Sequence, residues 1–90
     1  MLQSESAMTV TQIAKELNMS GNMLNKILNK ENVQYKINGQ WVLRKEYQNK
    51  GLTKTATKSF MNNKLEIEYK AFTVWTQKGR KFIHDLVGNI

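Results

Sequence analysis

Hydrophobic residues near the start of the chain recur with the spacing of an amphipathic helix. They occupy positions i, i+3, i+4 and i+7 of one segment: Val10, Ile13, Ala14 and Leu17. Thr9 and Gln12 have the spacing of a capping box, in which each side-chain oxygen accepts a hydrogen bond from the other residue's backbone N–H. We expect the helix to end near Asn18, because asparagine tolerates the left-handed backbone conformation.

A second amphipathic helix is predicted over residues 21–30, with Ser20 as its N-cap. Four polar residues fall within one arc of about 100° on this helix: Asn22, Asn25, Lys26 and Asn29. The apolar residues occupy the opposite side: Met23, Leu24, Ile27 and Leu28. Two short helices joined by a tight turn around Met19 predict a helix-turn-helix, whose second helix enters the major groove of DNA.

The polar face of the second helix suits base recognition. Asparagine can pair with adenine through two hydrogen bonds, and lysine can reach guanine or a phosphate. Asparagine is also a poor helix former, so a face that only contacts solvent would more often carry Glu, Lys, Gln or Ala. The alternative is that this face is simply solvated, as on any surface helix.

The segment 33–44 predicts a β-hairpin. Apolar and polar residues alternate before Asn38-Gly39, a favoured two-residue turn, and a second strand can follow it. Its first strand is expected to place Val33, Tyr35 and Ile37 on one face, where Trp41 and Leu43 of the return strand would meet them. A hairpin after a helix-turn-helix is the winged-helix arrangement, and its tip would present Lys36, Asn38 and Gln40 to DNA. A purely structural hairpin with a solvated tip is the alternative.

The rest of the chain predicts a short turn or helical piece around residues 46–48, a longer hairpin and a final helix. Apolar and charged residues alternate strictly over residues 65–70, as in a β-strand with one apolar face. We expect Lys54 and Lys58 of the preceding strand to face Glu66 and Glu68 of this strand. Thr76 can cap the last helix, Gly88-Asn89 is expected to end it, and Gly79 indicates a close approach to the strand of Trp75. The predicted fold class is α+β: a winged helix-turn-helix with β-hairpin wings and a C-terminal helix.

Charge and composition narrow the function classes. The chain has 90 residues, 14 Lys and Arg against 7 Asp and Glu, and a net charge of +7. Residues 1–32 sum to zero, with three basic and three acidic side chains, so residues 33–90 carry the whole excess. This favours a polyanionic partner, double-stranded DNA before a membrane. The chain has no cysteine, which excludes disulfides and thiolate chemistry, and no membrane span or signal peptide is recognisable.

The candidate DNA contacts come from both helices of the predicted helix-turn-helix, the hairpin and the basic segment after it. They are Thr11, Ser20, Asn22, Asn25, Lys26, Asn29, Lys30, Lys36, Asn38, Arg44 and Lys54. Residues 1–8 have little periodicity and are expected to be a disordered start or linker, so the domain is predicted to span residues 9–90.

The assembled pattern resembles the C-terminal domain of phage antirepressors, the KilA-C or ANT domain. The resemblance lies in the segment Met8–Leu17, in Met19-Ser20, Leu24-Asn25 and Leu28, in Asn38–Leu43, in Tyr47–Gly51, and in the closing segment Val74–Ile83 with its Trp-Thr-x-x-Gly motif. It implies that the domain normally follows a separate N-terminal domain, and that the parent protein acts in the lysis–lysogeny switch of a temperate phage. It also implies DNA binding in the bacterial host cytoplasm, with Trp41, Trp75 and Gly79 as packing residues.

Two other function classes, an enzyme and a protein-interaction module, fit the sequence less well than DNA binding. An enzyme is disfavoured, because His84 and Asp85 are adjacent on a predicted helix and point apart, and no phosphate loop or metal-ligand spacing occurs. We therefore expect no cofactor and no metal. The main alternative is a protein-interaction module that binds a phage repressor or joins antirepressor subunits as a homo-oligomer. Its apolar surface could be supplied by Met23, Leu52, Phe60 and Met61, although each of these residues could equally belong to the core.

Overall fold

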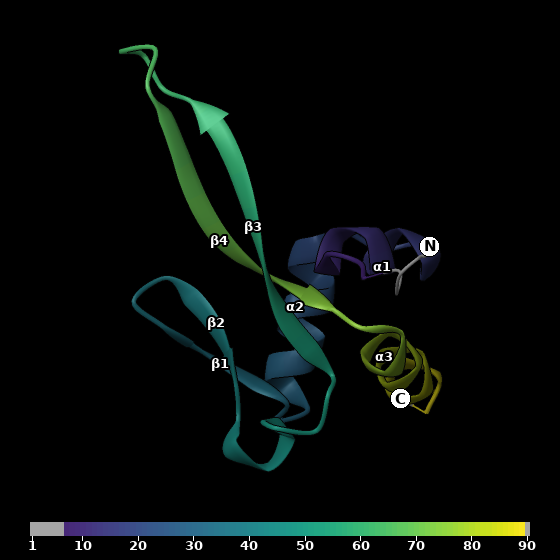
Figure 1. Cartoon of the computed structure of the whole chain (residues 1–90). Coiled ribbons are helices and arrows are strands. Elements are labelled where there is room, and N and C mark those ends of the chain that lie inside the picture. The colour runs from purple at the N-terminus through teal and green to yellow at the C-terminus, as the bar shows by residue number, and fades with distance from the viewer. Residues whose placement is uncertain (1–6, 90) are drawn as a thin grey trace, which may run out of the picture.

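The computed structural model describes residues 7–89. Over these residues it has an α+β fold of three α-helices and two antiparallel hairpins (Figure 1). In chain order the elements are α1 (Val10–Glu16), α2 (Gly21–Lys30), β1 (Gln34–Ile37), β2 (Gln40–Leu43), the 3-10 helix η1 (Lys45–Tyr47), β3 (Thr53–Met61), β4 (Ile67–Trp75) and α3 (Gln77–Gly88). The predicted α+β class, with two hairpins and a C-terminal helix, is confirmed.

The helix boundaries follow the local capping signals. The Thr9 hydroxyl accepts from the Gln12 amide at 3.3 Å, and the Thr9 amide donates to Gln12 Oε1 at 2.9 Å, so the capping box forms. Ser20 Oγ accepts from the Met23 amide at 3.1 Å and caps α2. Asn18 has a φ of 60°, in the left-handed region, and reverses the chain between α1 and α2.

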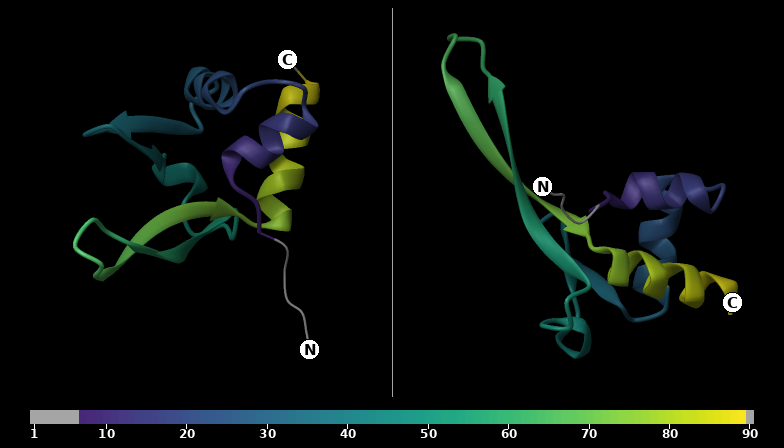
Figure 2. Two further views of the ribbon diagram at one scale, coloured as in Figure 1. Left: turned by 90° about the horizontal axis from the view of Figure 1, so that it is seen from above. Right: turned by 45° about the vertical axis from the view of Figure 1, so that its right-hand side comes forward.

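One hydrophobic core joins the helices to the bases of the hairpins. Its buried members are Ile13, Ala14, Leu24, Leu28, Val33, Leu52, Trp75 and Ile83. They come from α1, α2, α3, β4 and the segments before β1 and β3, so the core ties together parts that are distant in sequence. Figure 2 shows α1, α2 and α3 gathered on one side, with the hairpins extending from them.

Position 79 requires a glycine, because α3 closely approaches the strand of Trp75, as the sequence predicts. A Cβ at this position would lie 2.1 Å from the carbonyl oxygen of Leu52 and 2.8 Å from Cε3 of Trp75. The first turn of α3 therefore packs directly on the start of β3 and the end of β4. Thr76, which caps α3, also donates its hydroxyl to the Gly51 carbonyl at 2.6 Å.

The first hairpin forms as predicted, but its facing residues differ from expectation. Asn38 and Gly39 have φ values of 50° and 80°, as a type I′ turn requires. Trp41 lies opposite Lys36, and Leu43 lies opposite Gln34. The prediction that Trp41 and Leu43 meet Tyr35 and Ile37 was wrong, because a two-residue turn places Ile37 opposite Gln40 and fixes every later pair.

The second hairpin also differs in register. Lys54 lies opposite Val74, and Lys58 lies opposite Lys70. The predicted pairing of Lys54 and Lys58 with Glu66 and Glu68 was therefore wrong. The reason is the connection over residues 62–66, where Asn62 Oδ1 accepts from the amides of Lys64 and Glu66 at 2.8 and 3.0 Å. This turn delays the start of β4 to Ile67.

Met8, which precedes the predicted start of the domain at Thr9, makes an ordered contact with β4. Met8 pairs with Trp75 in an isolated antiparallel bridge, with backbone hydrogen bonds of 2.9 and 2.6 Å. Met8 also packs against the core. The sequence prediction placed it in a linker, whereas it extends the edge of β4. Residues 1–6, which belong to the same predicted linker, lie outside the described residues.

Candidate nucleic-acid interface

Helix α2 has one buried face and one exposed polar face. Leu24 and Leu28 have no solvent exposure and pack into the core. The exposed face carries four of the predicted DNA contacts: Asn22, Lys26, Asn29 and Lys30. Met23, expected on the apolar side, is 53% exposed, because its position borders this polar face. In the top view, α2 lies at the periphery of the helical part (Figure 2, left).

The N-terminus of α2 lies against α1. A Cβ on Gly21 would lie 2.8 Å from Oγ1 of Thr11, so glycine permits a close approach of the two helices. Thr11 and Ser20 are exposed at this junction, although the Ser20 hydroxyl is already engaged as the cap. Both predicted contacts are therefore adjacent to Asn22 at the first turn of α2.

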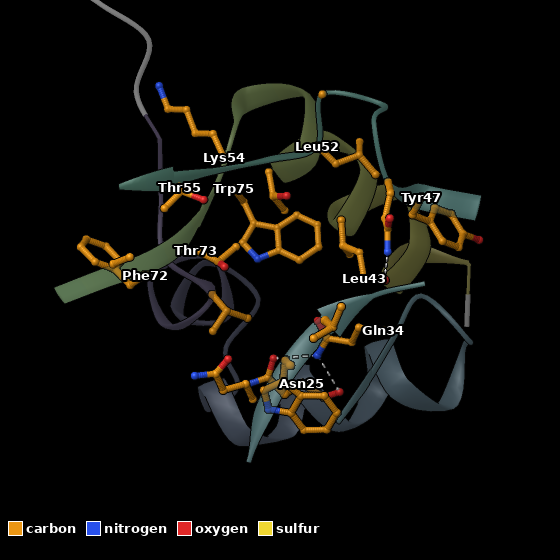
Figure 3. Close-up of a pocket in the computed structure, with 18 of the residues that line it drawn as sticks. Asn25, Gln34, Leu43, Tyr47, Leu52, Lys54, Thr55, Phe72, Thr73 and Trp75 are labelled. Atoms are coloured by element: carbon orange, nitrogen blue, oxygen red, sulfur yellow. Dashed lines mark hydrogen bonds between the residues drawn. The ribbon is translucent and has the colours of Figure 1, made fainter. Parts of the chain in front are cut away.

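Asn25 differs from the other polar residues of α2. It is half-buried, and its Oδ1 accepts from Nε2 of Gln34 at 2.9 Å (Figure 3). Gln34 is the first residue of β1 and is 4% exposed. A buried amide needs such partners, so this contact fixes the first hairpin on α2. The side-chain oxygen of Asn25 is thus already hydrogen-bonded to Gln34 within the domain.

Two cations of the first hairpin lie over aromatic rings. Lys36 Nζ is 5.3 Å from the ring centre of Trp41, and Arg44 Cζ is 5.4 Å from that of Tyr35. Trp41, expected in the core, is only half-buried beneath Lys36. Lys36 is exposed near the turn, together with Asn38. Arg44 is half-buried at the opposite end, next to β2, and its Nε has no hydrogen-bond partner among residues 7–89.

An open groove of about 840 Å³ lies between the two hairpins. Figure 3 shows the Trp75 indole directed into it from β4, with Gln34 and Leu43 on the opposite side. Lys54 of β3 lines this groove and is therefore separate from the exposed face of α2. Over residues 7–89, no group of three or more His, Cys, Asp or Glu side chains is placed to hold a metal ion.

The single histidine takes part in a contact between helices. Glu16 of α1 accepts from Nε of Arg80 at 2.8 Å, and its Oε1 also lies 2.9 Å from Nε2 of His84. Both partners belong to α3. The Arg80 guanidinium, and then the His84 ring, lower the pKa of Glu16 below its usual 4.5. Conversely, the Glu16 carboxylate raises the pKa of Arg80. This cluster joins the two ends of the described chain.

The structure thus distributes the predicted contacts over three parts of the domain. The α1–α2 unit contains Thr11, Ser20, Asn22, Asn25, Lys26, Asn29 and Lys30. Lys36, Asn38 and Arg44 belong to the first hairpin or its end, and Lys54 belongs to the second. Of the residues that the sequence offered for an exposed apolar surface, Phe60 and Met61 are exposed on the second hairpin, whereas Leu52 is buried in the core. Sequence reasoning missed the other exposed apolar residues of this hairpin, which are Leu65, Ile67 and Tyr69. The signal was the alternation over residues 65–70, but alternation alone does not show whether any element covers the apolar side.

Comparison with known proteins identifies the family. No curated protein and no solved structure matches the chain. Within residues 7–89, no helix has the length and hydrophobicity that a membrane crossing requires. The profile of the phage antirepressor protein KilAC domain matches residues 1–89, nearly the whole chain. The chain therefore belongs to the phage antirepressor KilAC (ANT) family, as its sequence motifs predicted.

Proposed function

We propose that this domain binds double-stranded DNA, with α2 as the recognition helix of a winged helix-turn-helix. The exposed face of α2 carries the proposal. Asn22, Lys26 and Asn29 project from a helix whose other face is anchored by Leu24 and Leu28. A helix held rigidly on one side, with amide and ammonium groups free on the other, suits insertion into the major groove.

The roles within the proposed interface follow from the contacts of each residue. Asn22 and Asn29 are the base-reading candidates, whereas Lys26 and Lys30 can reach bases or phosphates. Thr11 and Ser20 would contact the backbone near the first turn of α2. Asn25, also predicted to read bases, is better placed to position the hairpin, because its oxygen is held by Gln34.

The first hairpin is proposed to contact phosphates through Lys36 and Asn38, which are exposed at and beside its turn. The stacking of Lys36 on Trp41 leaves the ammonium group at the surface and limits its conformations. Arg44 and Lys54 are more distant contributors to the positive potential that would attract DNA.

Titration of labelled duplex DNA by fluorescence anisotropy tests the proposal. A duplex from a phage regulatory region and a scrambled duplex are compared at low and near-physiological salt. We expect Asn22→Ala and Asn29→Ala to reduce the preference for the phage duplex by about tenfold each, as lost base contacts do. Asn63→Ala, in the exposed turn of the second hairpin, is the matched control. Equal losses on both duplexes would contradict base reading by α2.

Because the chain belongs to the phage antirepressor KilAC family, we propose that this DNA binding serves the lysis–lysogeny switch in the cytoplasm of the bacterial host. A second candidate function is protein binding, either to a phage repressor or between antirepressor subunits. The observation that favours it is the exposed apolar surface of the second hairpin, where Ile67 and Tyr69 are 62% and 73% exposed.

A further inference from the structure

The second hairpin forms an arm that projects from the rest of the domain. Figures 1 and 2 show the distal parts of β3 and β4 extending away from the helices. Large apolar side chains cluster there with exposures of 43–78%: Phe60, Met61, Leu65, Ile67 and Tyr69. An isolated two-stranded ribbon of this kind gains little stability alone, and its exposed apolar side chains indicate a binding surface.

The backbone of β4 offers a free edge along this arm. Both backbone groups of Trp75 bond to Met8, so they point away from β3. Directions alternate along an antiparallel strand, and therefore Ile67, Tyr69, Ala71 and Thr73 also direct their N–H and C=O groups outward. Within residues 7–89, this edge is paired only at Trp75.

We propose that two copies of the chain associate through this edge. Their β4 strands would pair antiparallel around a twofold axis at Tyr69, which joins the two arms into a four-stranded sheet. Tyr69 would exchange both backbone hydrogen bonds with Tyr69 of the second copy. Ile67 would pair in the same way with Ala71 of the second copy. This self-association rests on the second candidate function, association between antirepressor subunits, and does not depend on the proposed DNA binding.

Charge complementarity selects this register. Glu68 and Lys70 flank Tyr69 and share one face of the strand, because residues two apart point to the same side. Centred on Tyr69, the pairing places Glu68 opposite Lys70 of the second copy, and the twofold axis repeats this contact. These pairs are of the non-hydrogen-bonded type, in which opposing side chains lie closest.

Neighbouring registers lack this complementarity. A twofold axis at Lys70 would place the two lysines opposite one another, and an axis at Glu68 would oppose the two carboxylates. An axis at Ala71 would place Lys70 opposite Phe72 and would require the edge of Trp75, which Met8 occupies. The outer edge of β3 cannot form such ion pairs, because its only charged residues are Lys54 and Lys58.

The proposed contact also offsets an unfavourable pair within the arm. Lys58 lies directly opposite Lys70, and like charges at such positions destabilise a hairpin. Glu68 of the second copy would add a carboxylate next to this pair. On the other face, Tyr69 would lose part of its large exposed area against Tyr69 of the second copy, and Ile67 would do so against Ala71 and Tyr69 of that copy.

Sedimentation over a concentration series tests the association with the 90-residue chain. We expect a reversible shift from 10.5 kDa toward twice that mass. Glu68→Lys or Lys70→Glu should each raise the dimer dissociation constant about tenfold or more, because both copies change an attraction into a repulsion. The double variant Glu68→Lys/Lys70→Glu restores opposite charges in this register and should recover dimerisation. Glu46→Lys and Lys45→Glu, on exposed η1, are the matched charge controls.

A cross-linking experiment tests the register independently. The chain has no cysteine, so Tyr69→Cys gives one thiol per copy. Across the proposed axis, the two Cα atoms would lie about 5.5 Å apart, within reach of a disulfide or short thiol cross-linker. We expect rapid covalent dimer formation, and much slower reaction for Thr57→Cys, which is also exposed but lies on β3.

Three outcomes would overturn the proposal. The first is a monomer at all concentrations up to the millimolar range. The second is a dimer that Glu68→Lys and Lys70→Glu weaken but the double variant does not restore. The third is a monomeric chain whose arm variants instead lose binding to a phage repressor, which would make the arm a repressor-binding surface. Because sedimentation needs no DNA, each outcome is distinguishable from a failure of the proposed DNA binding.

Discussion

Nε2 of Gln34 donates to Oδ1 of Asn25 at 2.9 Å, and this hydrogen bond joins the first hairpin to the helix proposed to read DNA. Gln34 is 4% exposed, and its amide also lies 3.4 Å from the Asn25 carbonyl. The hairpin and the helix therefore have one defined arrangement. An asparagine that resembles a base-reading residue in sequence thus has a positioning role in the structure.

Replacing Asn25 by alanine should destabilise the fold. The substitution leaves the buried Gln34 amide without its side-chain partner, and we expect a loss of about 1–2 kcal/mol in the free energy of unfolding. Asn29→Ala, on the exposed side of the same helix, should change this free energy by less than about 0.5 kcal/mol. Urea unfolding followed by circular dichroism measures both. If Asn25→Ala weakens DNA binding but leaves stability unchanged, Asn25 contacts DNA directly.

Local signals in the sequence were sufficient to predict where the first two helices start and where the first hairpin turns. Thr9 and Gln12 defined the start of α1, Ser20 that of α2, and Asn38-Gly39 the turn of the first hairpin. These features depend on residues within a few positions of one another, so the chain alone specifies them.

Tertiary relationships were harder to predict. The register of the second hairpin depends on Asn62, whose side chain organises a longer turn than a two-residue signal suggests. The partner of Asn25 lies nine residues away on another element. The exposure of Tyr69 depends on the absence of a covering element among the described residues, and an alternating pattern cannot show that.

The close contact at Gly79 predicts a large cost for its substitution. Alanine favours helices over glycine by about 1 kcal/mol. However, its Cβ would lie 2.1 Å from the Leu52 carbonyl oxygen, and relieving this overlap requires a shift of α3 from the core. We expect Gly79→Ala to lower the free energy of unfolding by about 2 kcal/mol in total.

Gly88 is the matched control, because a Cβ there meets no atom within 4 Å. Gly88→Ala should leave the unfolding midpoint unchanged or slightly higher. Thermal melting of both variants under the same conditions gives the two unfolding midpoints to be compared. Similar midpoints for the two would show that α3 adjusts freely at Gly79, contrary to the packing described.

The cluster of Glu16, Arg80 and His84 should make stability depend on pH in the acidic range. Arg80, and to a smaller extent His84, lowers the pKa of Glu16 below 4.5 in the folded chain. The unfolded chain therefore binds a proton at Glu16 more readily than the folded chain does. The stabilisation is fully present above the unfolded pKa and is lost as the pH falls through the lowered folded value.

Glu16→Gln isolates this effect. We expect the variant to melt at a lower Tm than the wild type at pH 7, and the difference to shrink as the pH falls below about 4.5. Glu46→Gln, which changes an exposed carboxylate on η1, is the control. A Tm difference that stays constant between pH 7 and pH 3 would contradict the contribution of this cluster.

Lys26 should contribute to the salt dependence of DNA binding. It is exposed on α2 between the two proposed base-reading residues, Asn22 and Asn29. If it contacts a phosphate, Lys26→Ala should weaken binding on all duplexes and reduce the slope of log K against log salt by about one. Lys81, exposed on α3 and paired with Asp85, is the control whose replacement should leave the slope unchanged. If both variants change the slope equally, DNA responds to the net charge of the domain and α2 has no special role.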